Sequence, residues 1–166
     1  MARAKASKTQ IGGYLLAAAG ALLLLAFASP TLGLTVDGPI LNLLFHAAMT
    51  VGFALLAVTS AGAPRIAFGL AALGWLLRIA AIFATLDALV GLADLLAVFG
   101  GLVGAALLVS GRKRNAGAIA LLVAMLLGVA YIFPALVAFL PGQVLGFVPG
   151  VFGAALLVAG ILLPRR

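Results

Sequence analysis

Two ionisable residues inside long apolar stretches are the first candidates for chemistry. Arg78 lies about twelve residues into one apolar run, or about 18 Å along a helix that rises 1.5 Å per residue. Asp94 lies in the following run, about 24 Å from that run's far end, so the two residues reach a similar depth. Because an unpaired charge in hydrocarbon is costly, we expect Arg78 to pair with Asp94, or failing that with Asp87. Such a pair is either an ion or substrate site or a clamp between two helices, with the clamp slightly favoured.

The remaining polar residues in apolar stretches are few. His46 is the one histidine of the chain, and a single imidazole supplies a single metal ligand. We expect a hydrogen-bonded histidine that faces the inside of a bundle. Asn42 and Asp94 are expected near its depth, so that a small polar vestibule is an alternative. The candidate polar and ion-pair cluster consists of Asn42, His46, Arg78, Asp94 and Gln143.

Enzymatic chemistry is not indicated. The chain contains no cysteine, which excludes disulfides, thiolate metal sites and thiol catalysis. No phosphate-binding loop, nucleophile with a base, or metal-ligand cluster is visible. Asp87 and Asp94 are seven residues apart and could share a helix face, but Asp87 is expected in a turn, so we expect no catalytic carboxylate pair. We therefore expect no catalytic residue, no metal and no cofactor.

The composition predicts the elements that carry these residues. The chain has 166 residues, of which 66% are hydrophobic and 8% charged, and its mean hydropathy is +1.38. Long apolar runs of this kind are typical of membrane spans, each of about 20 residues. The sequence predicts an all-α polytopic membrane protein, with one transmembrane domain over 1–166 and six helices. The predicted spans are 11–28, 40–59, 66–86, 89–109, 116–133 and 144–163.

The basic residues predict the orientation of these spans. Nine of the ten lie in the same set of connections and ends, and the tenth is Arg78. The positive-inside rule makes that side cytoplasmic, so both termini are predicted inside. The net charge of +7 thus serves topology and does not indicate nucleic-acid binding. Ala26-Phe27-Ala28 resembles a signal-peptidase site, but we expect the first apolar run to remain as a span.

A repeated tail suggests three tandem hairpins, about 9–60, 64–111 and 114–164. The stretches Gly-x-Ala-Leu-Leu or Gly-Ala-Ala-Leu-Leu start at Gly52, Gly104 and Gly153, and Asn42, Asp94 and Gln143 stand ten residues before them. If the repeat is genuine, these polar residues should turn inward, line an outer opening, or cap the even helices. Small residues also recur four apart, a spacing that lets helices approach closely. The pairs are Ala17 and Ala21, Gly100 and Gly104, and Gly146 and Gly150.

Three hairpins with these glycines, a Pro ending the first helix and a Gly-x-x-Leu-Leu tail resemble the acid-resistance membrane protein (HdeD-like) family. The second hairpin departs from the pattern, having Thr85-Leu86-Asp87 where the Pro would stand. The resemblance implies a stress-associated protein of the cell inner membrane without catalytic residues.

Two function classes follow. The first is a non-enzymatic structural or accessory subunit, embedded in the lipid bilayer with a membrane-protein partner or as a homo-oligomer. The alternative is a component of a small-solute transporter with a polar site in the outer half of the bundle. Six short helices with Ala-x-x-x-Ala near the first one resemble the substrate-binding subunits of energy-coupling-factor vitamin transporters.

Overall fold

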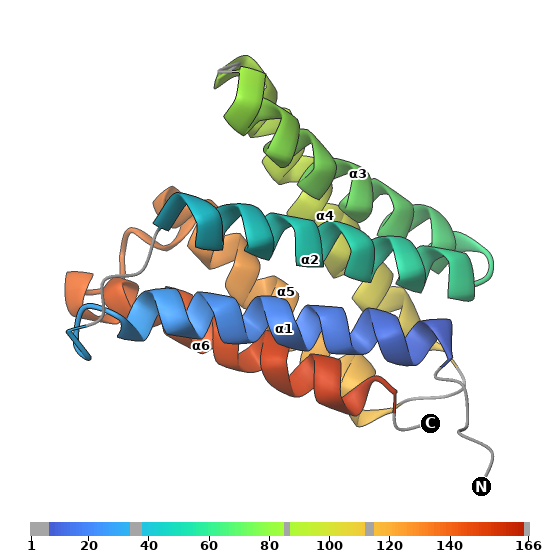
Figure 1. The fold of residues 1–166 in the computed structure, drawn as a ribbon. Coiled ribbons are helices and arrows are strands. Elements are labelled where there is room, and N and C mark those ends of the chain that lie inside the picture. Colours follow the sequence, from blue (N-terminus) through green and yellow to red (C-terminus); the bar gives the residue numbers. More distant parts are fainter. Residues whose placement is uncertain (1–6, 34–37, 85–86, 112–114, 165–166) are drawn as a thin grey trace, which may run out of the picture.

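The fold was analysed in a computed structural model that describes residues 7–33, 38–84, 87–111 and 115–164. Every regular element in these ranges is a helix. Six α-helices and one short 3₁₀ helix follow one another along the chain (Figure 1). Their bounds are α1 Lys8–Ala28, α2 Gly38–Thr59, α3 Ala63–Ala84, α4 Asp87–Ser110, α5 Ala116–Ile132, η1 Pro134–Val137 and α6 Gly142–Leu162.

Local sequence explains several helix ends. Ser7 accepts a hydrogen bond from the Gln10 backbone while the Gln10 side chain accepts one from the Ser7 backbone, so α1 begins with a capping box. Asn115 caps α5 in a similar way, its Oδ1 lying 2.6 Å from the Ala118 backbone nitrogen. α5 ends at Ile132, and Pro134 then begins η1. Each apolar run of the sequence therefore contains one α-helix.

Five of the helices are long and apolar enough to cross a membrane. Their lengths are 21 or 22 residues over the apolar part, and their mean hydropathy lies between 1.9 and 2.3. The outward-facing side chains include many leucine, isoleucine, valine and phenylalanine residues, which suits contact with lipid. α5 has 17 residues and is shorter than these five. The protein is thus an all-helical, multi-pass membrane protein by length and composition.

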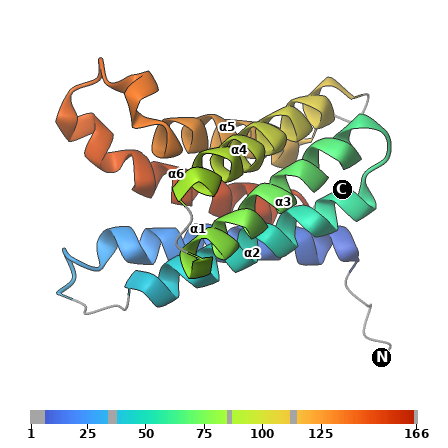
Figure 2. The ribbon, with the colours of Figure 1, turned by 90° about the horizontal axis from the view of Figure 1, so that it is seen from above.

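The helices form a closed ring in chain order. Each of α1 to α6 packs on the next one, and α6 packs back on α1. Figure 1 shows α1 and α6 running beside each other, and Figure 2 shows that the first part of α6 diverges from α1. The tip formed by the end of α3 and the start of α4 stands apart from the other helices (Figure 1). The start of α1 and the end of α6 lie at the same end of the bundle.

Large side chains fill the middle of this ring. The fully buried ones include Leu16, Met49, Phe53, Phe68 and Trp75. In lipid, helices gain little from excluding water from one another, so close van der Waals packing must hold them together. The core therefore depends on the fit between these side chains and the small residues opposite them.

Glycines bring several helix pairs into backbone contact, among them α1 with α6 and α3 with α4. A Cβ on Gly20 would lie 2.5 Å from the Gly153 carbonyl oxygen, so α1 and α6 touch where both lack a side chain. A Cβ on Gly74 would lie 2.6 Å from the Ala93 carbonyl oxygen and would also strike Ala97. Side chains at these two positions would push apart α1 and α6, or α3 and α4.

The repeated glycines do not play one uniform part. Gly52 packs on Leu16 of α1, and Gly104 packs on Phe68 of α3, so each faces the first helix of its own hairpin. Gly153 instead packs on Gly20 of α1, not on α5. The third tail therefore closes the ring, a role that the first two tails do not share.

Candidate functional site

The central feature of the site is an ion pair between α3 and α4. Arg78 Nε lies 2.6 Å from Asp94 Oδ1, which is the partner expected from the sequence. The Arg78 side chain is 28% exposed and the Asp94 side chain 10%. The other expected partner, the Asp87 side chain, lies outside the described residues.

Helix packing explains why this pair can form. Gly74 lies one turn before Arg78 and meets the backbone around Ala93 and Ala97, on either side of Asp94. The close approach of the two backbones at this point shortens the distance that the side chains must span. A short arginine–carboxylate contact across two packed helices both neutralises the charge and fixes their register.

An aromatic cluster lies beside the ion pair. The His46 and Trp75 ring centroids are 5.3 Å apart, and Phe45 meets Trp75 edge to face at 5.5 Å. His46 is 6% exposed and Trp75 1%. In the described part of the chain, His46 Nδ1 and Trp75 Nε1 have no hydrogen-bond partner. Buried polar atoms are normally hydrogen-bonded, so these two nitrogens are exceptions among the described residues.

Arg78 is also close enough to act electrostatically on two other side chains. These are the His46 imidazole and the Tyr131 phenol, which belong to α2 and α5.

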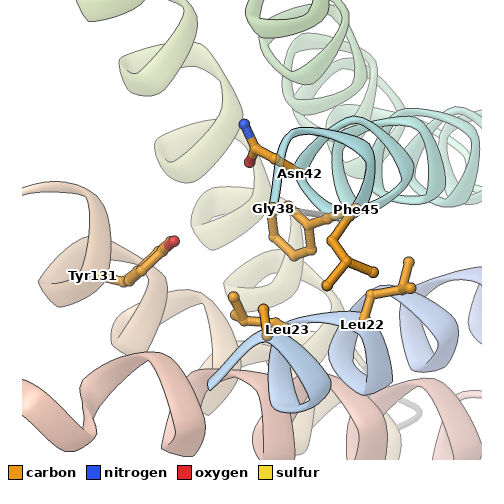
Figure 3. Close-up of a pocket in the computed structure, with 8 residues that line it drawn as sticks. Leu22, Leu23, Gly38, Asn42, Phe45 and Tyr131 are labelled. Atoms are coloured by element: carbon orange, nitrogen blue, oxygen red, sulfur yellow. The ribbon is translucent and has the colours of Figure 1, made fainter. Parts of the chain in front are cut away.

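A pocket opens between α1, α2 and α5, close to the aromatic cluster (Figure 3). Its volume is about 220 Å³. The floor is apolar, and the polar groups are the Asn42 amide from α2 and the Tyr131 hydroxyl from α5, both labelled in Figure 3. The lining residues are Leu22, Leu23, Ala26, Gly38, Leu41, Asn42, Phe45 and Tyr131. Neither polar side chain makes a hydrogen bond to another described residue, and both are exposed.

The expected polar cluster is brought together only in part. Arg78, Asp94 and His46 lie near one another, and Asn42 lines the neighbouring pocket. Gln143 is exposed, is not among the residues that line this pocket, and is the second residue of α6.

The expectation that Asn42, Asp94 and Gln143 take equivalent places and cap the even helices is wrong. They are the fifth, eighth and second residues of α2, α4 and α6. Pro141 is the N-cap of α6, and no side chain caps that helix end. Each polar residue does stand ten residues before a repeated glycine. The three helices, however, begin at different distances before their polar residue. Of the three, only Asp94 is buried.

Sequence reasoning missed two residues of the site. Tyr131 supplies the pocket's hydroxyl group, although it is not one of the five residues of the expected polar cluster. Phe45 was not singled out, although it joins the pocket to Trp75. Tyr131 lies three residues before Pro134, but no sequence signal shows which way the end of that helix turns.

The described residues contain no group of three His, Cys, Asp or Glu side chains that could hold a metal ion. A comparison with protein-family models, curated proteins and solved structures finds no match in any of the three. The chemistry that the site itself offers is therefore hydrogen bonding beside a neutralised ion pair.

Proposed function

We propose that this protein is a non-enzymatic, six-span protein of the cytoplasmic membrane that serves as a structural or accessory subunit, with both termini inside. The observation that carries the proposal is the closed helical ring with its apolar exterior. Within the described part of the chain, the charged side chains Arg78 and Asp94 pair with each other and neutralise their charges. A stress-associated role, as the HdeD-like resemblance implies, belongs to the same proposal.

The sixth span in this proposal is α5. Its 17 residues extend about 26 Å, and η1 adds length after it. A span can be as short as about 17 residues when the bilayer thins or flanking residues reach the interface. The tight contact of α5 with α6, in which Gly117 meets the Leu163 backbone, supports a position inside the bundle.

The accessory function is tested by isolating the tagged protein in mild detergent and then in lipid nanodiscs. The expected result is a fixed stoichiometry with a membrane-protein partner or with further copies of this chain, measured by native mass spectrometry. A chain that remains monomeric and alone in both preparations, at its native expression level, would contradict the proposal.

A second candidate function is a component of a small-solute transporter. It is favoured by the pocket of about 220 Å³, whose lining includes the Asn42 amide and the Tyr131 hydroxyl. Small molecules that remain bound in the same preparations would support this function. They are identified by mass spectrometry after the protein has been denatured, with an empty-nanodisc preparation as control.

A further inference from the structure

The pocket between α1, α2 and α5 has the size of a small single-ring molecule. An apolar protein cavity of about 150 Å³ holds a benzene molecule. The present pocket measures about 220 Å³, which leaves room for one ring and a short substituent. Leu22, Leu23, Ala26 and Phe45 provide an apolar surface for the ring.

Two uncharged polar groups meet this apolar surface. Asn42 and Tyr131 come from different helices, and each can donate and accept a hydrogen bond. A mostly apolar pocket with a few convergent polar groups is the usual form of a small-molecule site. A lipid acyl chain would cover the floor but would leave the amide and the hydroxyl without a partner.

The charge of the pocket restricts the ligand further. None of the eight lining residues is ionisable at neutral pH; Tyr131 is present as a phenol. Arg78 does not line the pocket and is paired with Asp94. An ionised ligand would lose its hydration without gaining a counter-charge, which is costly.

We infer that this pocket binds a small uncharged molecule with an apolar ring-sized body and one hydroxyl or amide group. The inference rests on the second candidate function, since it names the class of solute. The pocket lies at the end of α1 and the start of α2, opposite to Lys8 and Arg65. With the proposed orientation, the solute enters from outside the cell.

Trp75 provides a direct readout, because it is the one tryptophan of the chain and its ring contacts Phe45 of the pocket wall at 5.5 Å between centroids. The probe is 4-bromobenzyl alcohol, whose bromine quenches nearby tryptophan fluorescence. Full-length protein in phosphatidylcholine nanodiscs is titrated with this probe, with 4-bromotoluene and with 4-bromobenzoate. Quenching by the alcohol should saturate, with about three- to tenfold tighter binding than the toluene, the range of one hydrogen bond. The benzoate should show no saturable quenching.

Three variants separate the pocket from the lipid. Ala26→Phe places a ring in the pocket and should abolish saturable quenching. Ala18→Phe is the matched control, because Ala18 is exposed on the same helix and does not line the pocket. Tyr131→Phe should weaken binding of the alcohol about two- to tenfold and leave that of the toluene unchanged.

Equal, non-saturating quenching in the natural protein and Ala26→Phe would overturn the inference, because the probe would then only be dissolved in lipid. Equal affinity for the alcohol and the toluene would also overturn it and would assign the groove to hydrocarbon chains. If a charged solute remains bound to Ala26→Phe, the transporter function would be supported. The pocket between α1, α2 and α5 would then not be its solute site, and the inference would be wrong. If the probe binds saturably but the purified protein carries no solute from the cell, the pocket inference would stand and the transporter function would lose its support.

Discussion

Removal of either partner of the Arg78–Asp94 pair should destabilise the bundle, and the two losses should not add. Breaking a buried ion pair typically costs about 3–5 kcal/mol. The Arg78 side chain is 28% exposed, so solvent screening should reduce the loss to about 2–3 kcal/mol for each single alanine variant, at or below the lower limit of this range.

The two single variants should differ in a definite direction. Asp94→Ala leaves an arginine that can extend its apolar stem and move its charge toward the polar surface. Arg78→Ala leaves a carboxylate whose side chain is 10% exposed and whose short stem cannot move it. Arg78→Ala should therefore cost about 3 kcal/mol and Asp94→Ala about 2 kcal/mol, and the double variant about 3 kcal/mol.

The assay is unfolding by sodium dodecyl sulfate in mixed micelles, followed by Trp75 fluorescence and by circular dichroism. Two signals are needed because Trp75 lies three residues before Arg78. Leu76→Ala is the control, since this α3 side chain is 51% exposed and its loss should change the unfolding free energy by less than about 0.5 kcal/mol. Additive losses in the double variant, within about 0.5 kcal/mol, would refute the coupling of the two residues.

Three further predictions concern topology and packing. In a chain that has no natural cysteine, Thr31→Cys should react with an impermeant maleimide from outside intact cells, and Lys113→Cys should react only after the membrane is opened; the reverse pattern would invert the topology. Gly74→Ala should lower the unfolding free energy by about 1–3 kcal/mol because its Cβ would strike α4, whereas Gly69→Ala on the same helix meets open space and should be neutral or stabilising by up to about 1 kcal/mol. His46→Leu should leave stability unchanged or higher, because it removes a buried nitrogen that has no partner among the described residues; a loss above about 1 kcal/mol in the same assay would mean that this nitrogen is satisfied.

The depth of charged residues could be predicted from the sequence, whereas their lateral neighbours could not. Helical rise is fixed, so counting residues brings Arg78 and Asp94 to one level. The same counting also placed Gln143 at the start of the sixth span, where it is the second residue of α6. What failed was the expected equivalence with Asn42 and Asp94, which lie further into their helices. The long apolar runs predict that a helix is present. The residue at which each helix starts depends on the short turn before it.

The facing of each helix was the part that sequence could not supply. These helices are apolar on nearly all sides, so periodicity does not separate a lipid face from a core face. Of the small residues spaced four apart, Gly100 and Gly104 do meet α3, yet Gly146 meets nothing within 4 Å. The position of Tyr131 could not be predicted for the same reason. Its helix could equally have turned the ring to lipid, with a similar gain from burying it.

The closure of the ring by α6 on α1 has a consequence for biogenesis. Gly20 finds its partner in Gly153, a residue made 133 positions later (153 − 20). At about 5–20 residues per second, a ribosome needs about 7–27 s to supply it. Throughout that interval the glycine face of α1 is available to lipid or to a membrane chaperone. Assembly is therefore completed only by the last helix, and a chain that stalls before α6 leaves the glycine face of α1 uncovered.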